Sequence, residues 1–202
     1  MTAACLAVTR LYNQFRLQNV RARLLLVAII ILLAPAQSEA VQYREVEWTE
    51  LMPKEDLAAL LDPPDFLNGI EDGSQQDSVS ALNQREITDQ KAKRYREALS
   101  STQPIAEFDQ QAIRIPGYIV PLAQNEERRV TSFFIVPYFG ACLHMPPPPP
   151  NQILFVNFSD GIELQHLQQP FWFEGKLEIE ISERDIGTSA YTLHIDNYQL
   201  YE

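Results

Sequence analysis

Residues 171–181, Phe-Trp-Phe-Glu-Gly-Lys-Leu-Glu-Ile-Glu-Ile, decide the fold class of this chain. Apolar residues at 171, 173, 177, 179 and 181 alternate with Trp172 and with the charged residues at 174, 176, 178 and 180. Successive side chains of a β-strand point to opposite faces, so a period of two predicts a strand that is buried on one side. This stretch therefore indicates a β-sheet protein.

Four further segments read as strands. Residues 113–120 and 191–196 alternate in the same way, whereas 130–136 and 153–158 are nearly continuous apolar runs. Five strands at this spacing predict a mainly β fold, a five-stranded antiparallel OB-like barrel or curled sheet, within residues 108–202. Pro116 and Pro121 lie inside the first strand and predict an edge or a bulge, because proline cannot donate to a ladder.

Residues 41–107 have a different composition and are expected to form a short helical N-terminal extension. Leucines between Trp48 and Leu61 lie at partly helical spacing, and Pro63 and Pro64 end that segment. A second, polar helix is expected over residues 80–100. Between the two, residues 68–80 are polar and rich in turn formers, which predicts a flexible loop.

The first forty residues have the pattern of a signal peptide. Three arginines at 16, 21 and 23 precede an apolar run from Leu24 to Ala34, and Ser38-Glu39-Ala40 resembles a cleavage site. The run is too short to span a bilayer, which takes about 20 residues. We expect cleavage before Val41 and export to the periplasm, with no membrane-spanning segment afterwards; an uncleaved anchor is the alternative.

The charge of the exported chain argues against nucleic-acid binding. Removal of residues 1–40 takes away four arginines and one glutamate, which leaves 12 basic and 26 acidic residues and a net charge of −14. A surface of this sign repels phosphate backbones. A nucleic acid is therefore not expected among the partners.

The stretch 140–152 contains the candidate site. Cys142 and His144 are two residues apart and are followed by five prolines, Pro146–Pro150. In extended backbone their side chains point to the same side, about 6–7 Å apart. Five prolines adopt a stiff polyproline II conformation, so we expect a rigid strap beside this pair. Cys5 is removed with the leader, which leaves Cys142 without an intramolecular disulfide partner.

Three interpretations of Cys142 stay open. Zinc binds thiolate and imidazole and takes four ligands; His166 is the natural third ligand after Cys142 and His144, with Asp160, Glu163 or Glu174 as carboxylate candidates. Alternatively, Cys142 is a nucleophile and His144 its base, oriented by Asn151 or an acidic group. In the third interpretation Cys142 is a small buried hydrophobe.

Several motifs resemble one bacterial family. They are residues 108–122 (FDQQAIRIPGYIVPL), 136–152 (VPYFGACLHMPPPPPNQ), 171–177 (FWFEGKL) and 191–193 (YTL). Together they are similar to the exported domain-of-unknown-function family 3299, over roughly residues 41–202. The glycine usual in that family after Phe-Asp is Gln110 here. The resemblance implies an exported protein, often encoded near ABC-transporter components, some of them linked to zinc handling, and it implies no established activity.

These observations predict a periplasmic binding or accessory protein. It would be associated with zinc through Cys142, His144 and His166 and would work beside an envelope ABC transporter. We expect a non-enzymatic role. The alternatives are a thiol-dependent enzyme that uses Cys142 and His144, and a purely structural interaction module.

Overall fold

The computed structural model describes the chain in three stretches, residues 41–65, 90–140 and 147–201. All three belong to the second of two compact units, Val41–Glu202. The predicted signal peptide and the loop predicted over 68–80 lie outside the described residues. No helix within the described stretches is long and apolar enough to cross a membrane.

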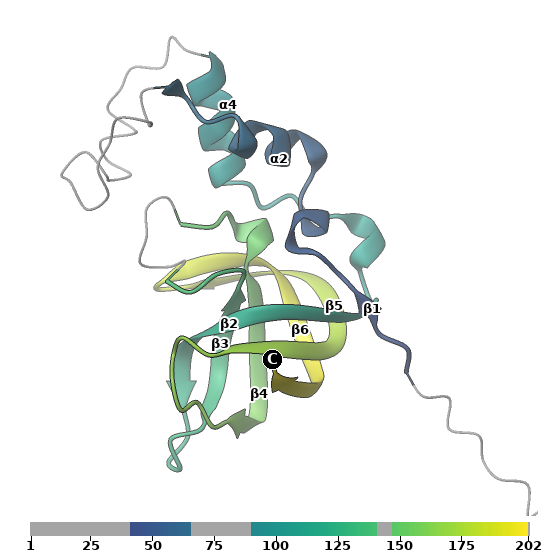
Figure 1. Cartoon of the computed structure of the whole chain (residues 1–202), viewed down its shortest axis with the longest axis vertical. Helices are drawn as coiled ribbons and strands as arrows, with labels where there is room; N and C mark the ends of the chain where they lie inside the picture. The colour runs from purple at the N-terminus through teal and green to yellow at the C-terminus, as the bar shows by residue number, and fades with distance from the viewer. Residues whose placement is uncertain (1–40, 66–89, 141–146, 202) are drawn as a thin grey trace, which may run out of the picture. The chain divides into compact units, whose positions relative to one another are not determined.

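Five long strands form a closed barrel (Figure 1). They are β2 (Ala112–Gln124), β3 (Val130–Val136), β4 (Leu154–Ile162), β5 (Pro170–Arg184) and β6 (Gly187–Leu200). Their order around the barrel is β2-β3-β4-β6-β5, and β5 pairs again with β2. The predicted mainly β, five-stranded OB-like barrel is confirmed.

One pairing within the barrel was not predicted. β4 and β6 run parallel, with Leu154 opposite Tyr191 and Phe155 opposite Thr192, whereas the other barrel pairs are antiparallel. The barrel is therefore mixed and not purely antiparallel. Alternation along a strand shows which face is buried, but it contains no information on the direction of the neighbouring strand.

The two prolines of β2 occupy the irregular positions that were predicted. Pairing with β3 begins only at Tyr118, so the β3 side of Pro116 has no ladder partner, and its carbonyl accepts a 2.7 Å hydrogen bond from Nε1 of Trp48. The register with β3 shifts between Pro121 and Ala123. The missing N–H of proline is thus tolerated at one edge and at one bulge.

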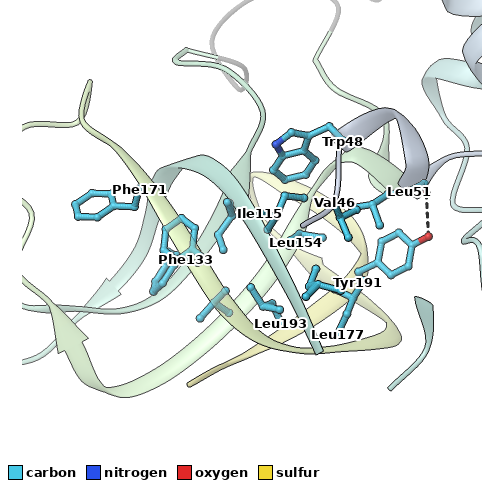
Figure 2. Packing of buried hydrophobic residues seen from close by; sticks show 14 of the residues in the cluster. Val46, Trp48, Leu51, Ile115, Phe133, Leu154, Phe171, Leu177, Tyr191 and Leu193 are labelled. Carbon is cyan, nitrogen blue, oxygen red and sulfur yellow. Dashed lines mark hydrogen bonds between the residues drawn. The ribbon is translucent and has the colours of Figure 1, made fainter. Parts of the chain in front are cut away.

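The barrel interior is a single apolar core that includes residues from the N-terminal extension (Figure 2). Phe133, Phe173 and Leu177 of the strands are fully buried. Val46 and Leu51, at 1% and 0% exposure, pack into the same cluster. The predicted domain boundary at residue 108 stays a prediction, but the segment around β1 (Arg44–Glu45) is part of the barrel core.

The described helices are short and lie before the barrel or beside β4. They are η1 (Trp48–Leu51), α2 (Lys54–Leu61), α4 (Gln90–Leu99), η3 (Ala106–Phe108) and η4 (Pro150–Gln152). The partly helical spacing between Trp48 and Leu61 corresponds to two helices, η1 and α2: Met52 between them is extended, with φ −123° and ψ 153°, and Pro53 caps α2. A residue before proline avoids the α region, which breaks the helix here.

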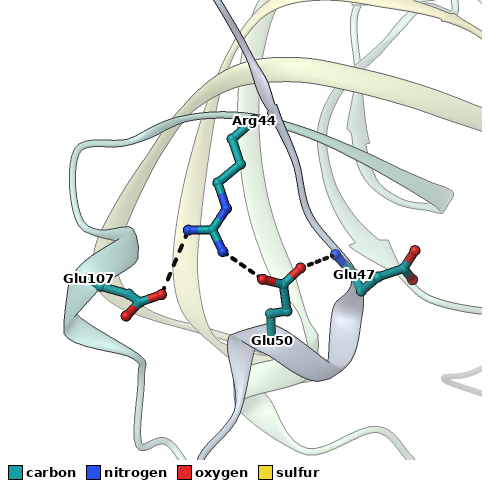
Figure 3. A network of polar contacts seen from close by, with 4 residues as sticks. All are labelled: Arg44, Glu47, Glu50 and Glu107. Carbon is teal, nitrogen blue, oxygen red and sulfur yellow. Dashed lines mark hydrogen bonds and ion pairs between the residues drawn. The ribbon is translucent and has the colours of Figure 1, made fainter.

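Exposed ionic contacts guide the N-terminal segment along the barrel (Figure 3). Arg44 forms ion pairs with Glu50 at 2.6 Å and with Glu107 of η3 at 3.7 Å. The second carboxylate oxygen of Glu50 accepts the backbone N–H of Glu47 at 3.0 Å. Exposed pairs of this kind contribute about 0–1 kcal/mol each. They fix the path of the segment, while apolar burial holds it in place.

Gln110 occupies the turn before β2 in a backbone conformation that favours glycine. Its φ is +61°, in the left-handed region where a side chain costs about 1–2 kcal/mol. Its N–H donates to the carbonyl of Leu177 at 2.7 Å. The turn before β2 is therefore formed with a non-glycine residue, which introduces local strain.

Candidate functional site

The described residues include one of the three predicted zinc ligands. His166 is exposed, in the loop between β4 and β5, and its carbonyl accepts the N–H of Gln169 at 3.2 Å. Cys142 and His144 lie outside the described residues, so the predicted set of three stays a prediction. Within the described stretches, no cluster of three or more histidine, cysteine or acidic side chains could hold a metal ion.

Residues 147–152, here called the proline strap, follow residues 141–146 in the sequence and lead into β4. Pro148 and Pro149 are buried, and Pro147 is exposed. The strap ends in η4, where the N–H of Gln152 donates to the carbonyl of Pro149 at 2.8 Å. Proline has a fixed φ and little freedom to lose on folding. The strap is therefore a stiff attachment for the loop.

Two buried amide side chains anchor the strap to the N-terminal segment. Gln152 donates from Nε2 to the carbonyl of Trp48 at 2.6 Å. Asn151, fully buried, directs its Nδ2 group toward Asp56 of α2 at 3.2 Å, Ser101 at 3.3 Å and the carbonyl of Gln103 at 3.2 Å. Buried polar groups normally have such partners. The strap position is thus fixed by residues about 50 to 100 positions away in sequence.

Tyr191 of β6 connects the same end of the barrel to two other segments. Its hydroxyl donates to the carbonyl of Leu51 at 2.8 Å (Figure 2). It also accepts the N–H of Ile105 at 2.6 Å. Burial raises the pKa of Tyr191 to about 12, and the hydrogen bond from Ile105 opposes that shift. The phenol stays neutral at physiological pH, so its role is to join the segments.

An apolar pocket of about 230 Å³ opens between the strap and the helices. Its walls include Leu57 and Leu60 of α2, Leu99 of α4, Tyr138 after β3, and Pro147–Pro149 of the strap. We call it the strap pocket. Tyr138 and Pro147 lie on either side of residues 141–146 in the sequence, and both line this pocket.

A second cavity, of about 530 Å³, lies between α2 and α4 and is lined mainly by charged residues. We call it the acidic groove. Lys91 forms ion pairs there with Asp62 at 2.8 Å and Asp65 at 3.5 Å. The hydrogen bond with Asp62 raises the pKa of Lys91, although desolvation opposes this effect. Since α2 lines both cavities, it separates an apolar surface from a charged one.

The outer face of β3 and β4 is filled by the chain itself. Phe134 and Val136 pack there with Ile153 and Phe155, and none of the four is more than 8% exposed. The guanidinium of Arg184 lies 4.4 Å from the centre of the Phe155 ring. OB barrels generally bind ligands on this face.

Comparison with known proteins decides the family. A family described as proteins of unknown function, DUF3299, matches residues 48–200. The chain belongs to the DUF3299 family. The resemblance inferred from the sequence is confirmed at this level, and the match begins within the N-terminal extension and runs through all five barrel strands.

The DUF3299 family also includes a solved structure similar to this chain. It is a DUF3299 protein from Pseudomonas aeruginosa PAO1, which is 29% identical and aligns with a TM-score of 0.56. The alignment covers 80% of this chain and 97% of that one. No curated protein matches the chain. Most of this chain is thus structurally similar to a DUF3299 relative, whereas the role of residues 141–146 stays a prediction.

Sequence reasoning missed the anchors of this DUF3299 site. From the sequence, Asn151 is only a candidate orienting group for His144, whereas in the structure its Nδ2 group holds the strap. Tyr191 was assigned only to a strand. Both are polar side chains at inward-facing or strap positions, and such residues normally find buried partners. That rule signals that a partner exists, but it does not identify Leu51 or Asp56.

Proposed function

We propose that this chain is a periplasmic binding or accessory protein that presents the loop 141–146 at one end of an OB-like barrel. The observation that carries the proposal is the strap pocket, because Tyr138 and Pro147 both line it. Four peptide units join Tyr138 to Cys142, and three join His144 to Pro147. Each spans at most about 3.6 Å, so chain length keeps Cys142 and His144 near this pocket.

We propose zinc as the ion that the loop binds. Thiolate and imidazole are both preferred zinc ligands, and a site of four is filled by Cys142, His144, His166 and a carboxylate or water. The support is the donor chemistry of the Cys-x-His pair and the stiff strap beside it. Stiff attachment lowers the entropy lost when ligands converge on an ion.

Metal titration of the protein purified without an affinity tag tests this proposal. We expect one zinc per chain under reducing conditions, lost in Cys142→Ser and in His144→Ala and weakened at least tenfold in His166→Ala. The matched control is His194→Ala, because His194 is exposed and pairs with Glu178 at 2.6 Å. No stoichiometric zinc in the unmodified protein, or an equal loss in the His194 variant, would contradict the proposal and favour a purely structural module.

One observation favours a thiol enzyme as the second candidate. The Oδ1 atom of Asn151 is buried and has no hydrogen-bond partner among the described residues. An amide oxygen is a suitable acceptor for the imidazole N–H of His144, with Cys142 as nucleophile. Alkylation by iodoacetamide across pH tests this role. A Cys142 thiol pKa well below the usual value of about 8.5 supports it, and an ordinary pKa contradicts it.

We propose export through cleavage after Ala40. The arginines and the short apolar run of residues 1–40 support it. Mass spectrometry of protein from the periplasmic fraction should give an N-terminus at Val41. An intact leader in the membrane fraction would show an uncleaved anchor.

A further inference from the structure

Helix α2 exposes more apolar surface than a core helix does. None of its eight residues is buried, and Leu61 is 75% exposed. Tyr138, which lines the strap pocket together with Leu57 and Leu60, is 45% exposed, and the next residue, Phe139, is 42% exposed. Grouped exposed apolar residues on a soluble domain mark interaction sites more often than isolated ones do. Residues of α2 line both the strap pocket and the acidic groove, so a binding partner on this helix can contact both cavities.

The strap pocket suits a single large apolar side chain. Its volume of about 230 Å³ is below the roughly 300–1,000 Å³ typical of pockets for whole small molecules. Leu57, Leu60 and Pro148 offer contacts on several sides. An anchor residue of a partner protein, inserted into a desolvated pocket, is the usual centre of such an interface.

The acidic groove favours a cation. Four carboxylates line it, those of Glu55, Asp56, Asp62 and Glu97, against the two cations Lys91 and Arg94. Ion pairs with Asp62 and Asp65 already occupy Lys91. Glu97 pairs in turn with Lys93 at 3.8 Å. With Asp65 and Lys93 included, five carboxylates and three cations leave a net charge of −2 around the groove. An added lysine or arginine lowers the repulsion among the carboxylates, which is charge complementarity at the scale of one side chain.

We propose that α2 is a docking site for a segment of a partner protein with a basic and a large apolar side chain. The apolar side chain fills the strap pocket, and the lysine or arginine enters the acidic groove. This inference rests on the proposed accessory role and names the chemistry of the partner. Residues 66–89 of the chain itself carry five acidic residues and one basic residue, so their charge disfavours them in the groove.

Selection from a phage-displayed library of random 12-residue peptides on the full chain tests the proposal. Enriched peptides should share a leucine, methionine or aromatic residue a few positions from a lysine or arginine. For one synthetic enriched peptide, Leu60→Asp should weaken binding at least tenfold, whereas Leu61→Asp, on the exposed side of α2, should not. Glu55→Lys should weaken binding about fivefold and reduce its dependence on salt, whereas Glu126→Lys at the β2–β3 turn should not.

Two outcomes would overturn the proposal. One is a set of enriched peptides without basic residues, or one whose binding is unaffected by Leu60→Asp. The other is a concentration-dependent dimer in sedimentation velocity that Leu60→Asp converts to monomer, which would assign the surface to a second copy of this chain. Zinc titration and peptide binding are separate measurements on the unmodified chain, so failure of the zinc proposal is distinguishable from failure of this one.

Discussion

β3 and α2 are both rich in apolar residues, yet they bury them very differently. Phe133, Phe134, Ile135 and Val136 of β3 all have 0% exposure, because β3 packs against the barrel core on one face and the outer cluster on the other. No residue of α2 is buried. Apolar composition alone therefore does not show whether an element stabilises the fold or provides a surface. The difference is that other elements cover both faces of β3, whereas no residue of α2 is fully covered.

Removing a core side chain should have the largest effect. Phe133→Ala leaves a cavity inside a closed barrel and should lower the free energy of unfolding by about 3–5 kcal/mol. Leu60→Ala removes a side chain that is only half-buried and should cost below about 1 kcal/mol. Urea unfolding of both variants measures the contrast. A similar loss in both would place α2 in the core and break the comparison.

Alkaline pH should unfold the barrel end through Tyr191. Its folded pKa is about 12 against an ordinary value of 10.0, so the unfolded chain releases the phenol proton first. The stabilisation is complete below pH 10, and roughly 2–3 kcal/mol is lost as pH rises to 12. Urea unfolding between pH 8 and 12 measures this fall. Tyr191→Phe should be less stable at pH 8 and should lose less on going to pH 12; an equal loss would assign the fall to other groups.

The strap should depend on its buried amides and not on exposed ones. Gln152→Ala leaves the carbonyl of Trp48 without the 2.6 Å donor and should cost about 1–2 kcal/mol. Gln103→Ala is the matched control, because Gln103 is exposed and contacts the strap only through its backbone carbonyl. Thermal unfolding should leave the Gln103 variant within about 0.5 kcal/mol of the unmodified protein. Equal losses would argue against the anchor.

Gln110→Gly should give the smallest effect and the opposite sign. Glycine adopts φ +61° without a clash, so the free energy of unfolding should rise by about 1 kcal/mol. Gln111→Gly, one residue later and without a positive φ, should instead lower it by about 0.5–1 kcal/mol. Urea midpoints compare the two. A loss in the Gln110 variant would show that its side chain stabilises the turn.

Local pattern predicted the barrel because each strand alternates or runs apolar over several residues. The predicted strand 130–136 agrees with β3, and 171–181 lies inside β5. The last strand, β6, extends well beyond the predicted residues 191–196. The prediction ended too early because exposed polar residues such as Asn197 and Gln199 interrupt the apolar alternation. The parallel pairing of β4 with β6 required knowledge of distant partners.

The candidate site was only partly predictable. A stiff proline segment beside Cys142 and His144 could be inferred from residue types alone. The contacts of Gln152 with Trp48, and of Tyr191 with Leu51, join residues 104 and 140 positions apart. Periodicity extends over a few residues and contains no signal at that separation. The strap pocket follows from these long-range contacts, so it could not be derived from the sequence.

Native-state hydrogen exchange in increasing urea tests most directly whether α2 is a surface element on a stable barrel. We predict that amides of α2 exchange through small openings with low free energy and little dependence on urea, while those of β3 exchange only through global unfolding. If the α2 amides show the same free energy and urea dependence as those of β3, α2 is part of the cooperative core and the distinction between the two regions is wrong.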